Sequence, residues 1–233
     1  MGQLVAESLR LYGARFWPSL ALGIGPALVG TGIAELPSAL IWALVPTIGT
    51  AVWSAAYVGA SRLALGAERG NTGVAFVAGC VAFGPLLLVR ILILPGAELV
   101  ALVYFALVSL AVPVALVEGR GLVDAIRRGT RLARADFVHE LGSLATLVIT
   151  IFLSGLVLVV VLHGFGDQAI RVAALLALLV LAPVFLLGAA LLYLDQSARV
   201  VESGTRRRRR RHADVHPALE PDGSGRADAE VEP

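Results

Sequence analysis

The chain has 233 residues and a formal net charge of +2, with 58% hydrophobic and only 15% charged residues. Soluble domains are about 45–50% apolar and about 25% charged, so this composition, with a mean hydropathy of +0.83, excludes an ordinary water-soluble domain. It predicts an all-α, polytopic integral membrane helix bundle. Arginine supplies every basic residue, which together with abundant Ala, Val, Leu and Gly indicates a GC-rich bacterial genome.

The N-terminal segment, residues 1–17, mixes polar and apolar side chains ahead of the first long apolar run. It does not have the pattern of a cleaved signal peptide, since its first basic residue, Arg10, follows a mixed polar start. We therefore expect an interfacial helix that leads into the membrane. Tyr12 and Trp17 fall near the predicted boundary, where amphipathic aromatic rings are favoured.

Six apolar windows follow, and each is close to the roughly 20 residues that a membrane-spanning helix needs. Short turns with helix breakers join the first window to the second, at Pro37, and the third to the fourth, at Pro95. Together the windows make up a membrane domain over residues 18–200. The six predicted spans are Pro18–Leu36, Ser38–Ala60, Val74–Leu94, Leu99–Val117, Leu141–Leu162 and Val172–Leu194.

The arginines are distributed unevenly between the two sides of these spans. With the N-terminus in the cytoplasm, seventeen of the nineteen arginines lie on the cytoplasmic side, Arg171 lies outside and Arg90 lies within the third span. The positive-inside rule therefore predicts a multi-pass protein of the cell membrane with both termini in the cytoplasm. The even number of predicted spans agrees with this orientation.

The first span is rich in residues that weaken a helix. Two explanations remain open: close packing against a neighbouring helix, or a hinge or unwound patch that lines a cavity. The residues concerned are Gly23, Gly25, Pro26, Gly30 and Gly32.

Three charged residues fall near the outer ends of the predicted spans: Glu35, Arg90 and Glu98. Arg90 lies about five residues below a turn, roughly 7 Å into the apolar region, where an unpaired charge is costly. We expect either an intramembrane ion pair of Arg90 with Glu98 or Glu35, or an arginine that snorkels to the outer surface. The pair would be structural or would line an outward cavity.

A basic segment over residues 119–137 separates the fourth span from the fifth. Read as a helix, it places one apolar stripe away from its arginines, which predicts a cytoplasmic amphipathic helix in the membrane interface. Each arginine there attracts anionic head groups by about 1 kcal/mol; the alternative is a solvated loop that only sets orientation. The stripe consists of Leu122, Ile126, Thr130, Ala133 and Phe137. The candidate contacts to lipid or a partner are Arg127, Arg128, Arg131 and Arg134.

The same stretch, VPVALVEGRGLVDAIRRGTRLARADF, resembles a segment of bacterial multi-span proteins of the glycerophosphoryl diester phosphodiesterase membrane-domain type. In that family a proline-containing helix leads into Glu-Gly-x-Gly, an acidic-Ala-Leu-Arg-Arg-Ser-x-Arg-Leu run and an aromatic residue that opens the next span. The N-terminal LRLYGARFWPSLAL is similar to the family's opening. Gly129 departs from the usual serine, and Ile126 from the usual leucine. The matching positions are Pro113, Glu118, Gly119, Gly121, Asp124, Ala125, Arg127, Arg128, Arg131, Leu132, Arg134 and Phe137.

The resemblance implies a helical membrane domain and no activity. Some family members carry this domain beside a catalytic phosphodiesterase barrel, but spans and a tail account for this whole chain. The sequence also has no phosphate-binding loop, HExxH, zinc-spaced Cys/His set or paired-aspartate transferase motif. Ser154 and His163 lie about 13 Å apart along one helix, too far to act as a catalytic pair. We therefore expect no catalytic residue, cofactor or metal.

Residues 201–233 form a tail with the composition of a disordered segment. Six consecutive arginines, Arg206–Arg211, precede a mostly acidic end. Beside a span, such a run is typical of a topology signal that contacts anionic lipid. This interpretation is favoured over nucleic-acid binding, which is the usual alternative for a basic run.

Two functions are consistent with these features. The first is a non-catalytic membrane scaffold, anchor or interaction module at the inner leaflet, whose partners are anionic lipid head groups and another membrane protein. The alternative is a small transporter or lipid-handling protein with a cavity near Arg90. A polar cavity at mid-depth, lined by the glycines of the first span, would favour transport; a tightly packed apolar bundle would favour the scaffold.

Overall fold

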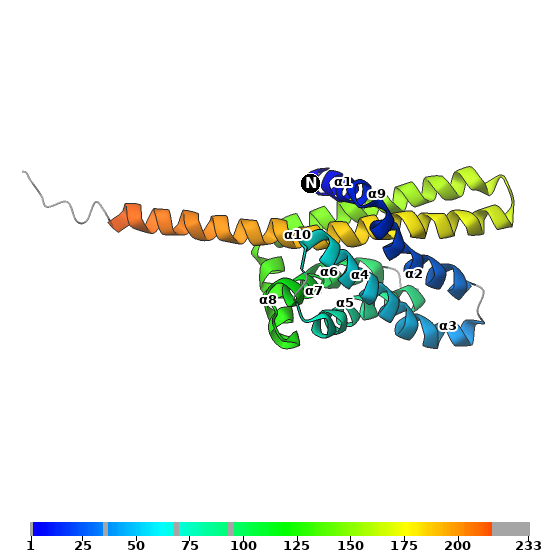
Figure 1. Ribbon diagram of the computed structural model, residues 1–233, viewed down its shortest axis with the longest axis horizontal. Coiled ribbons are helices and arrows are strands. Elements are labelled where there is room, and N and C mark those ends of the chain that lie inside the picture. Colours follow the sequence, from blue (N-terminus) through cyan, green and yellow to red (C-terminus); the bar gives the residue numbers. More distant parts are fainter. Residues whose placement is uncertain (1, 35–36, 68–69, 93–95, 216–233) are drawn as a thin grey trace, which may run out of the picture. The chain divides into compact units, whose positions relative to one another are not determined.

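The computed structural model describes residues 2–34, 37–67, 70–92 and 96–215 (Figure 1). These residues form helices and short connections, with no strand among them, so the predicted all-α fold class is confirmed. The chain divides into two compact units, Met1–Gln196 and Ser197–Pro233, which are described separately.

Helices follow one another along the described chain with few long connections. The segments α3, η1 and α4 follow one another directly, and a single residue separates α1 from α2 and α8 from α9. The elements are α1 (Gly2–Ala14), α2 (Phe16–Ala34), α3 (Ser38–Leu44), the π-helical segment η1 (Val45–Gly49), α4 (Thr50–Leu65), α5 (Thr72–Leu92), α6 (Ala97–Val108), α7 (Ala111–Val117), α8 (Leu122–Ala135), α9 (Phe137–His163) and α10 (Asp167–Val215).

By length and composition, five helical segments among the described residues can cross a membrane, which is compatible with a multi-pass membrane protein. They correspond to the second to sixth predicted spans. The first predicted span corresponds to α2, which is helical over Phe16–Ala34 but is not among the five; its predicted end at Leu36 lies outside the described residues. The five segments are Leu40–Leu65, Thr72–Val89, Leu99–Val117, Phe137–His163 and Gln168–Val200.

The second of the predicted spans is not a uniform α-helix. Its middle is the π-helical segment η1, with Pro46 near the start of that segment. Proline has no N–H to donate to the carbonyl four residues earlier, and a local π-bulge is one way in which a helix accommodates this loss. The segment therefore continues as one span from α3 through η1 into α4.

The fourth predicted span breaks between α6 and α7, and Pro113 explains the break. Without an N–H, Pro113 leaves the carbonyl of Ser109 without its usual helical donor. In the apolar interior such a carbonyl needs another partner. The hydroxyl of Tyr57, on α4, donates a hydrogen bond to this oxygen at 3.2 Å, and the N–H of Val112 lies 3.3 Å from it.

The same arrangement occurs at a second proline. Pro85 lies inside α5 and removes the donor for the carbonyl of Val81. The hydroxyl of Tyr104, on α6, donates to that carbonyl at 2.8 Å. Two proline-containing segments are therefore each tied to a neighbouring helix through the backbone carbonyl that the proline leaves free.

Four aromatic rings form the centre of the unit Met1–Gln196. Phe83 of α5 packs against Tyr57 of α4, with ring centroids 5.7 Å apart, and against Phe105 of α6, at 5.0 Å. Phe105 in turn stacks on Phe185 of α10 at 5.6 Å. Pairs at these separations stabilise a core beyond the area that they bury, so α4, α5, α6 and α10 share one aromatic centre.

The helix α10 continues to Val215, well beyond the predicted end of the last span. The predicted disorder from residue 201 therefore does not describe residues 201–215. This segment contains no proline, and arginine is a good helix former, so six arginines in a row extend a helix that has already begun. Residues 216–233 of the predicted tail lie outside the described residues.

Candidate functional site

The helices α4 and α7 end close together, because their last residues, Leu65 and Val117, line the same cavity. The short connection from α7 to α8 lines that cavity too, so α8 begins at this end of the bundle. We call this the α8 end of the bundle. Gly119 has φ +64°, a left-handed conformation that glycine adopts without a Cβ clash, and so the chain turns sharply before α8. The helix is shorter than the predicted segment 119–137 because this turn occupies its first residues.

One face of α8 is buried against protein. Ala125, Gly129 and Leu132 have the spacing i, i+4, i+7 and are buried, and α8 packs on α5, α6 and α7. At Gly129 the contact is backbone to backbone, since an added Cβ would lie 2.8 Å from the nitrogen of Ala111. Because α6 and α7 separate at this point, Gly129 packs directly on the proline-induced break.

The predicted apolar stripe is therefore offset from the real buried face. Of its residues, Ala133 is buried, whereas Leu122, Ile126, Thr130 and Phe137 are only half-buried. The predicted stripe was chosen by its large apolar side chains, whereas the small residues Ala125 and Gly129 pack against the neighbouring helices. The apolar face also contacts helices α5, α6 and α7, where the sequence predicted contact with lipid.

Three arginines occupy the face of α8 opposite the buried one. Arg127, Arg131 and Arg134 are exposed and have the same i, i+4, i+7 spacing, displaced by about half a turn. None of the three forms an ion pair with another described residue. We call these three residues the arginine face.

The fourth candidate, Arg128, has a different role. Its Nε lies 3.3 Å from Oε1 of Glu118, at the end of α7, and its side chain is partly buried. Arg120 places its Nε 2.5 Å from the other carboxylate oxygen, and the hydroxyl of Tyr193, on α10, donates to Oε1 at 3.4 Å. Glu118 therefore joins α7, α8 and α10 at the α8 end of the bundle.

The environment of Glu118 favours its charged form. Burial alone would raise the pKa of this carboxyl, but hydrogen bonds and charge from Arg120 and Arg128 outweigh burial and hold the pKa below the ordinary value of 4.5. The motif matched Glu118 without giving it a role. The structure identifies it as the group that fixes α8, and no sequence pattern pointed to its partner Tyr193.

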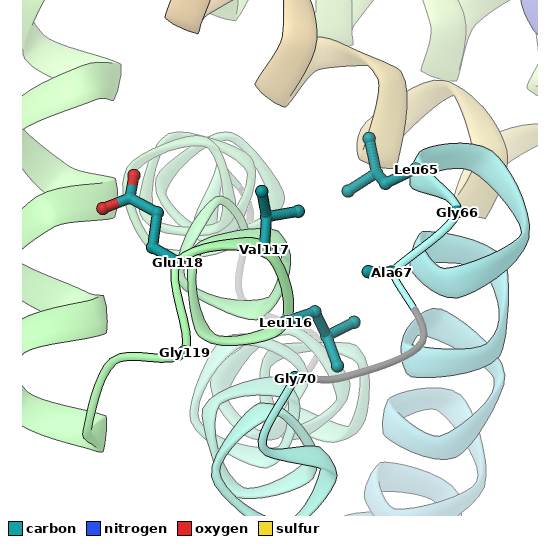
Figure 2. A pocket seen from close by; sticks show the side chains of 8 residues that line it. All are labelled: Leu65, Gly66, Ala67, Gly70, Leu116, Val117, Glu118 and Gly119. Carbon is teal, nitrogen blue, oxygen red and sulfur yellow. The ribbon is translucent and has the colours of Figure 1, made fainter.

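A cavity of about 520 Å³ adjoins this cluster. Figure 2 shows that Leu65, Leu116 and Val117 surround it, whereas the carboxylate of Glu118 extends away from Leu65. The rest of the lining is backbone at the ends of α4 and α7, including Gly66 and Gly119. The cavity therefore offers apolar side chains and polypeptide backbone, and the Glu118 carboxylate forms its ion pairs with Arg120 and Arg128.

A second hollow lies between α2 and the first turns of α10. It has a volume of about 550 Å³ and is lined mainly by apolar atoms of both helices, with Gly30, Gly32 and Arg171 among them. Nearby, α2 approaches α10 so closely that a Cβ on Gly23 would lie 2.1 Å from the carbonyl oxygen of Leu179. We call this hollow the α2–α10 groove.

Three glycines of α2, Gly23, Gly25 and Gly30, thus serve helix packing, whereas Gly32 faces open space. Gly23 lies against the carbonyl that Pro183 leaves free inside α10, and α2 is a continuous helix with no unwound patch. Of the two explanations left open by the sequence, close packing is the one observed. Gly30 and Gly32 line the groove, and the hollow stays open there because neither residue has a side chain.

The predicted intramembrane ion pair cannot be placed. Glu35 and the side chains of Arg90 and Glu98 lie outside the described residues. The backbone of Arg90 belongs to α5 and that of Glu98 to α6. The pairing of Arg90 therefore stays a prediction.

Sequence reasoning missed two buried polar residues, Glu140 and Gln196. Glu140 directly precedes the fifth predicted span and was treated as lying outside it, and Gln196 follows the sixth. Both are fully buried within α9 and α10. The sequence does show that Glu140 directly precedes a long apolar run. It does not show that Glu140 is buried, because that depends on which helices pack beside α9.

No family model, curated protein or solved structure matches this chain. The resemblance to the membrane-domain family therefore stays a prediction that rests on its motif.

Proposed function

We propose that this chain is a non-catalytic membrane protein that uses the arginine face of α8 to bind anionic groups at the cytoplasmic leaflet. The observation that carries the proposal is the fixed position of α8. Its apolar face packs on α5, α6 and α7, and Glu118 holds Arg128. Three arginines are left exposed in one row.

The distribution of charge supports anionic lipid as the first partner. The arginine excess on one side of the predicted spans supports a cytoplasmic position for the α8 end of the bundle. Anionic lipids there attract basic side chains by about 1 kcal/mol each. Three arginines together contribute about 3 kcal/mol, roughly a 100-fold preference. An acidic surface on another membrane protein is the competing partner.

Lipid exchange in nanodiscs tests the proposal. The full chain would be placed in discs of phosphatidylcholine with added phosphatidylglycerol, and bound lipid would be counted by native mass spectrometry. We expect a phosphatidylglycerol preference that is lost when Arg127, Arg131 and Arg134 are all changed to Gln. No preference in the wild-type protein would refute the proposal.

Lysine at the same three positions is the matched control. It keeps the charge but lacks the planar fork with which arginine binds a carboxylate in two places. Retained lipid preference in the lysine variant supports a charge-driven lipid contact. Loss of the preference with lysine shows that the lipid phosphate is bound by the planar guanidinium fork and not by charge alone.

The α2–α10 groove supports a second candidate, a lipid-handling protein. An apolar hollow of about 550 Å³ between two helices fits an acyl chain, and Arg171 supplies a cationic group at its lining. The groove is lined by glycines of the first predicted span, as the transport hypothesis expected. It is apolar, however, and the charged residue in it is Arg171, where the sequence predicted Arg90.

Filling the groove tests this second candidate. A Cβ on Gly32 has no neighbour within 4 Å, so Gly32→Leu occupies the hollow without a backbone clash. Gly84→Leu is the matched control, because Gly84 of α5 also has open space and lies outside the groove. We expect Gly32→Leu, but not Gly84→Leu, to reduce lipid that co-purifies in mild detergent; equal retention by both variants argues against lipid handling.

A further inference from the structure

Glu140 and Gln196 are polar side chains with no exposed surface. Neither carboxylate oxygen of Glu140, nor the amide oxygen or nitrogen of Gln196, has a hydrogen-bond partner among the described residues. Buried polar groups are nearly always paired with protein, water or an ion. An ionisable group inside a membrane helix is by default a candidate functional site.

The two residues lie at the same level on adjacent antiparallel helices. Figure 1 shows α9 and the first part of α10 side by side, joined by a turn. Glu140 is two helical turns from Leu147 and shares its face toward α10, and Gln196 falls opposite Glu140 in the register of the pair. The contacts that fix this register are His139 with Asp195 at 3.2 Å, Leu147 with the Cβ position of Gly188, and Leu181 with that of Gly155.

The missing partner has to be positively charged and small. Burying a carboxylate without compensation costs several kcal/mol, and two carboxylate oxygens with one amide oxygen form a set of hard ligands suited to a hard cation. Asp136, the residue just before α9 and one turn from Glu140, adds negative charge at Glu140. A divalent ion usually needs more carboxylates, and no group of three metal-binding side chains occurs among the described residues.

We propose that Glu140 and Gln196 form a buried binding site for a monovalent cation between α9 and α10. The cation neutralises the Glu140 carboxylate and is coordinated by the amide oxygen of Gln196. A proton on the carboxyl group would let Glu140 and Gln196 hydrogen-bond to each other, but the two side chains form no such hydrogen bond. Asp136 is half-exposed, so water reaches to within about one helical turn, roughly 6 Å, of the site.

Sodium serves as the probe. The full chain in nanodiscs would be melted in sodium chloride and in choline chloride of equal ionic strength, because choline is too large for the site. We expect the wild-type midpoint to rise with sodium and to saturate, as binding to the folded state requires. Glu140→Gln and Gln196→Leu should abolish the difference, and Thr150→Val, whose hydroxyl bonds its own helix, should leave it unchanged.

Three results would overturn the proposal: equal midpoints in the two salts for the wild-type protein, a sodium effect that survives Glu140→Gln, or an infrared band of a protonated carboxyl that disappears in Glu140→Gln. Line broadening of sodium in nuclear magnetic resonance needs no variant. Wild-type discs should broaden the line more than empty discs, and equal broadening also rejects the site. This readout decides the question even where a variant fails to fold.

Discussion

The hydrogen bond from Tyr57 to the carbonyl of Ser109 should be coupled energetically to Pro113. Tyr57→Phe removes the hydroxyl and leaves a buried carbonyl with only the long contact to the N–H of Val112. A buried group that loses its partner costs about 1–3 kcal/mol, whereas hydrogen bonds measured inside membrane proteins average about 0.6 kcal/mol with a maximum near 1.7. At a distance of 3.2 Å we expect a loss of about 1 kcal/mol.

The double mutant makes this expectation specific. Pro113→Ala restores an N–H that donates to the same carbonyl, so the loss caused by Tyr57→Phe should shrink to near zero in that background. Reversible unfolding in mixed micelles, titrated with dodecyl sulfate and followed by circular dichroism, gives the four free energies of the cycle. Tyr12→Phe is the control: the Tyr12 hydroxyl is buried with no partner among the described residues, so its removal should not destabilise. An equal loss from Tyr57→Phe with and without Pro113 would refute the reasoning.

Two further predictions concern the attachment of α8. Gly129→Ala should destabilise the protein by about 1–3 kcal/mol, because its Cβ would press on the backbone nitrogen of Ala111; Gly121→Ala, with open space around it, should be nearly neutral in the same titration. Glu118 should stabilise α8 above pH 4.5, its ordinary pKa, and this contribution should be lost as the pH falls through its lowered folded pKa. Glu118→Gln should flatten that part of the pH profile, and an unchanged profile would show that Glu118 contributes nothing.

The sequence predicted the features that depend on local composition. Five predicted spans coincide with apolar helices, since length and hydropathy determine them. The helix α8 was also predicted, because its apolar and basic residues separate at helical spacing.

The features that depend on contacts between helices were not predictable. Pro113 and Pro85 showed where helices would break, but only the packing shows that Tyr57 and Tyr104 satisfy the freed carbonyls. The predicted apolar stripe of α8 is rotated away from the observed buried face. The prediction used apolar side chains, and Gly129, which lies on the buried face, has none.

The position of α8 relative to lipid is the most direct test of the central proposal. Val123 is 62% exposed on α8, one turn before Arg127. In a Cys80→Ser background, Val123→Cys would carry a fluorophore, and nanodiscs would contain either brominated phosphatidylglycerol or brominated phosphatidylcholine. We predict stronger quenching by the brominated anionic lipid, and equal quenching by both lipids once Arg127, Arg131 and Arg134 are changed to Gln. Equal quenching by both lipids in the protein with its arginines intact would contradict the proposal that the arginine face binds anionic lipid.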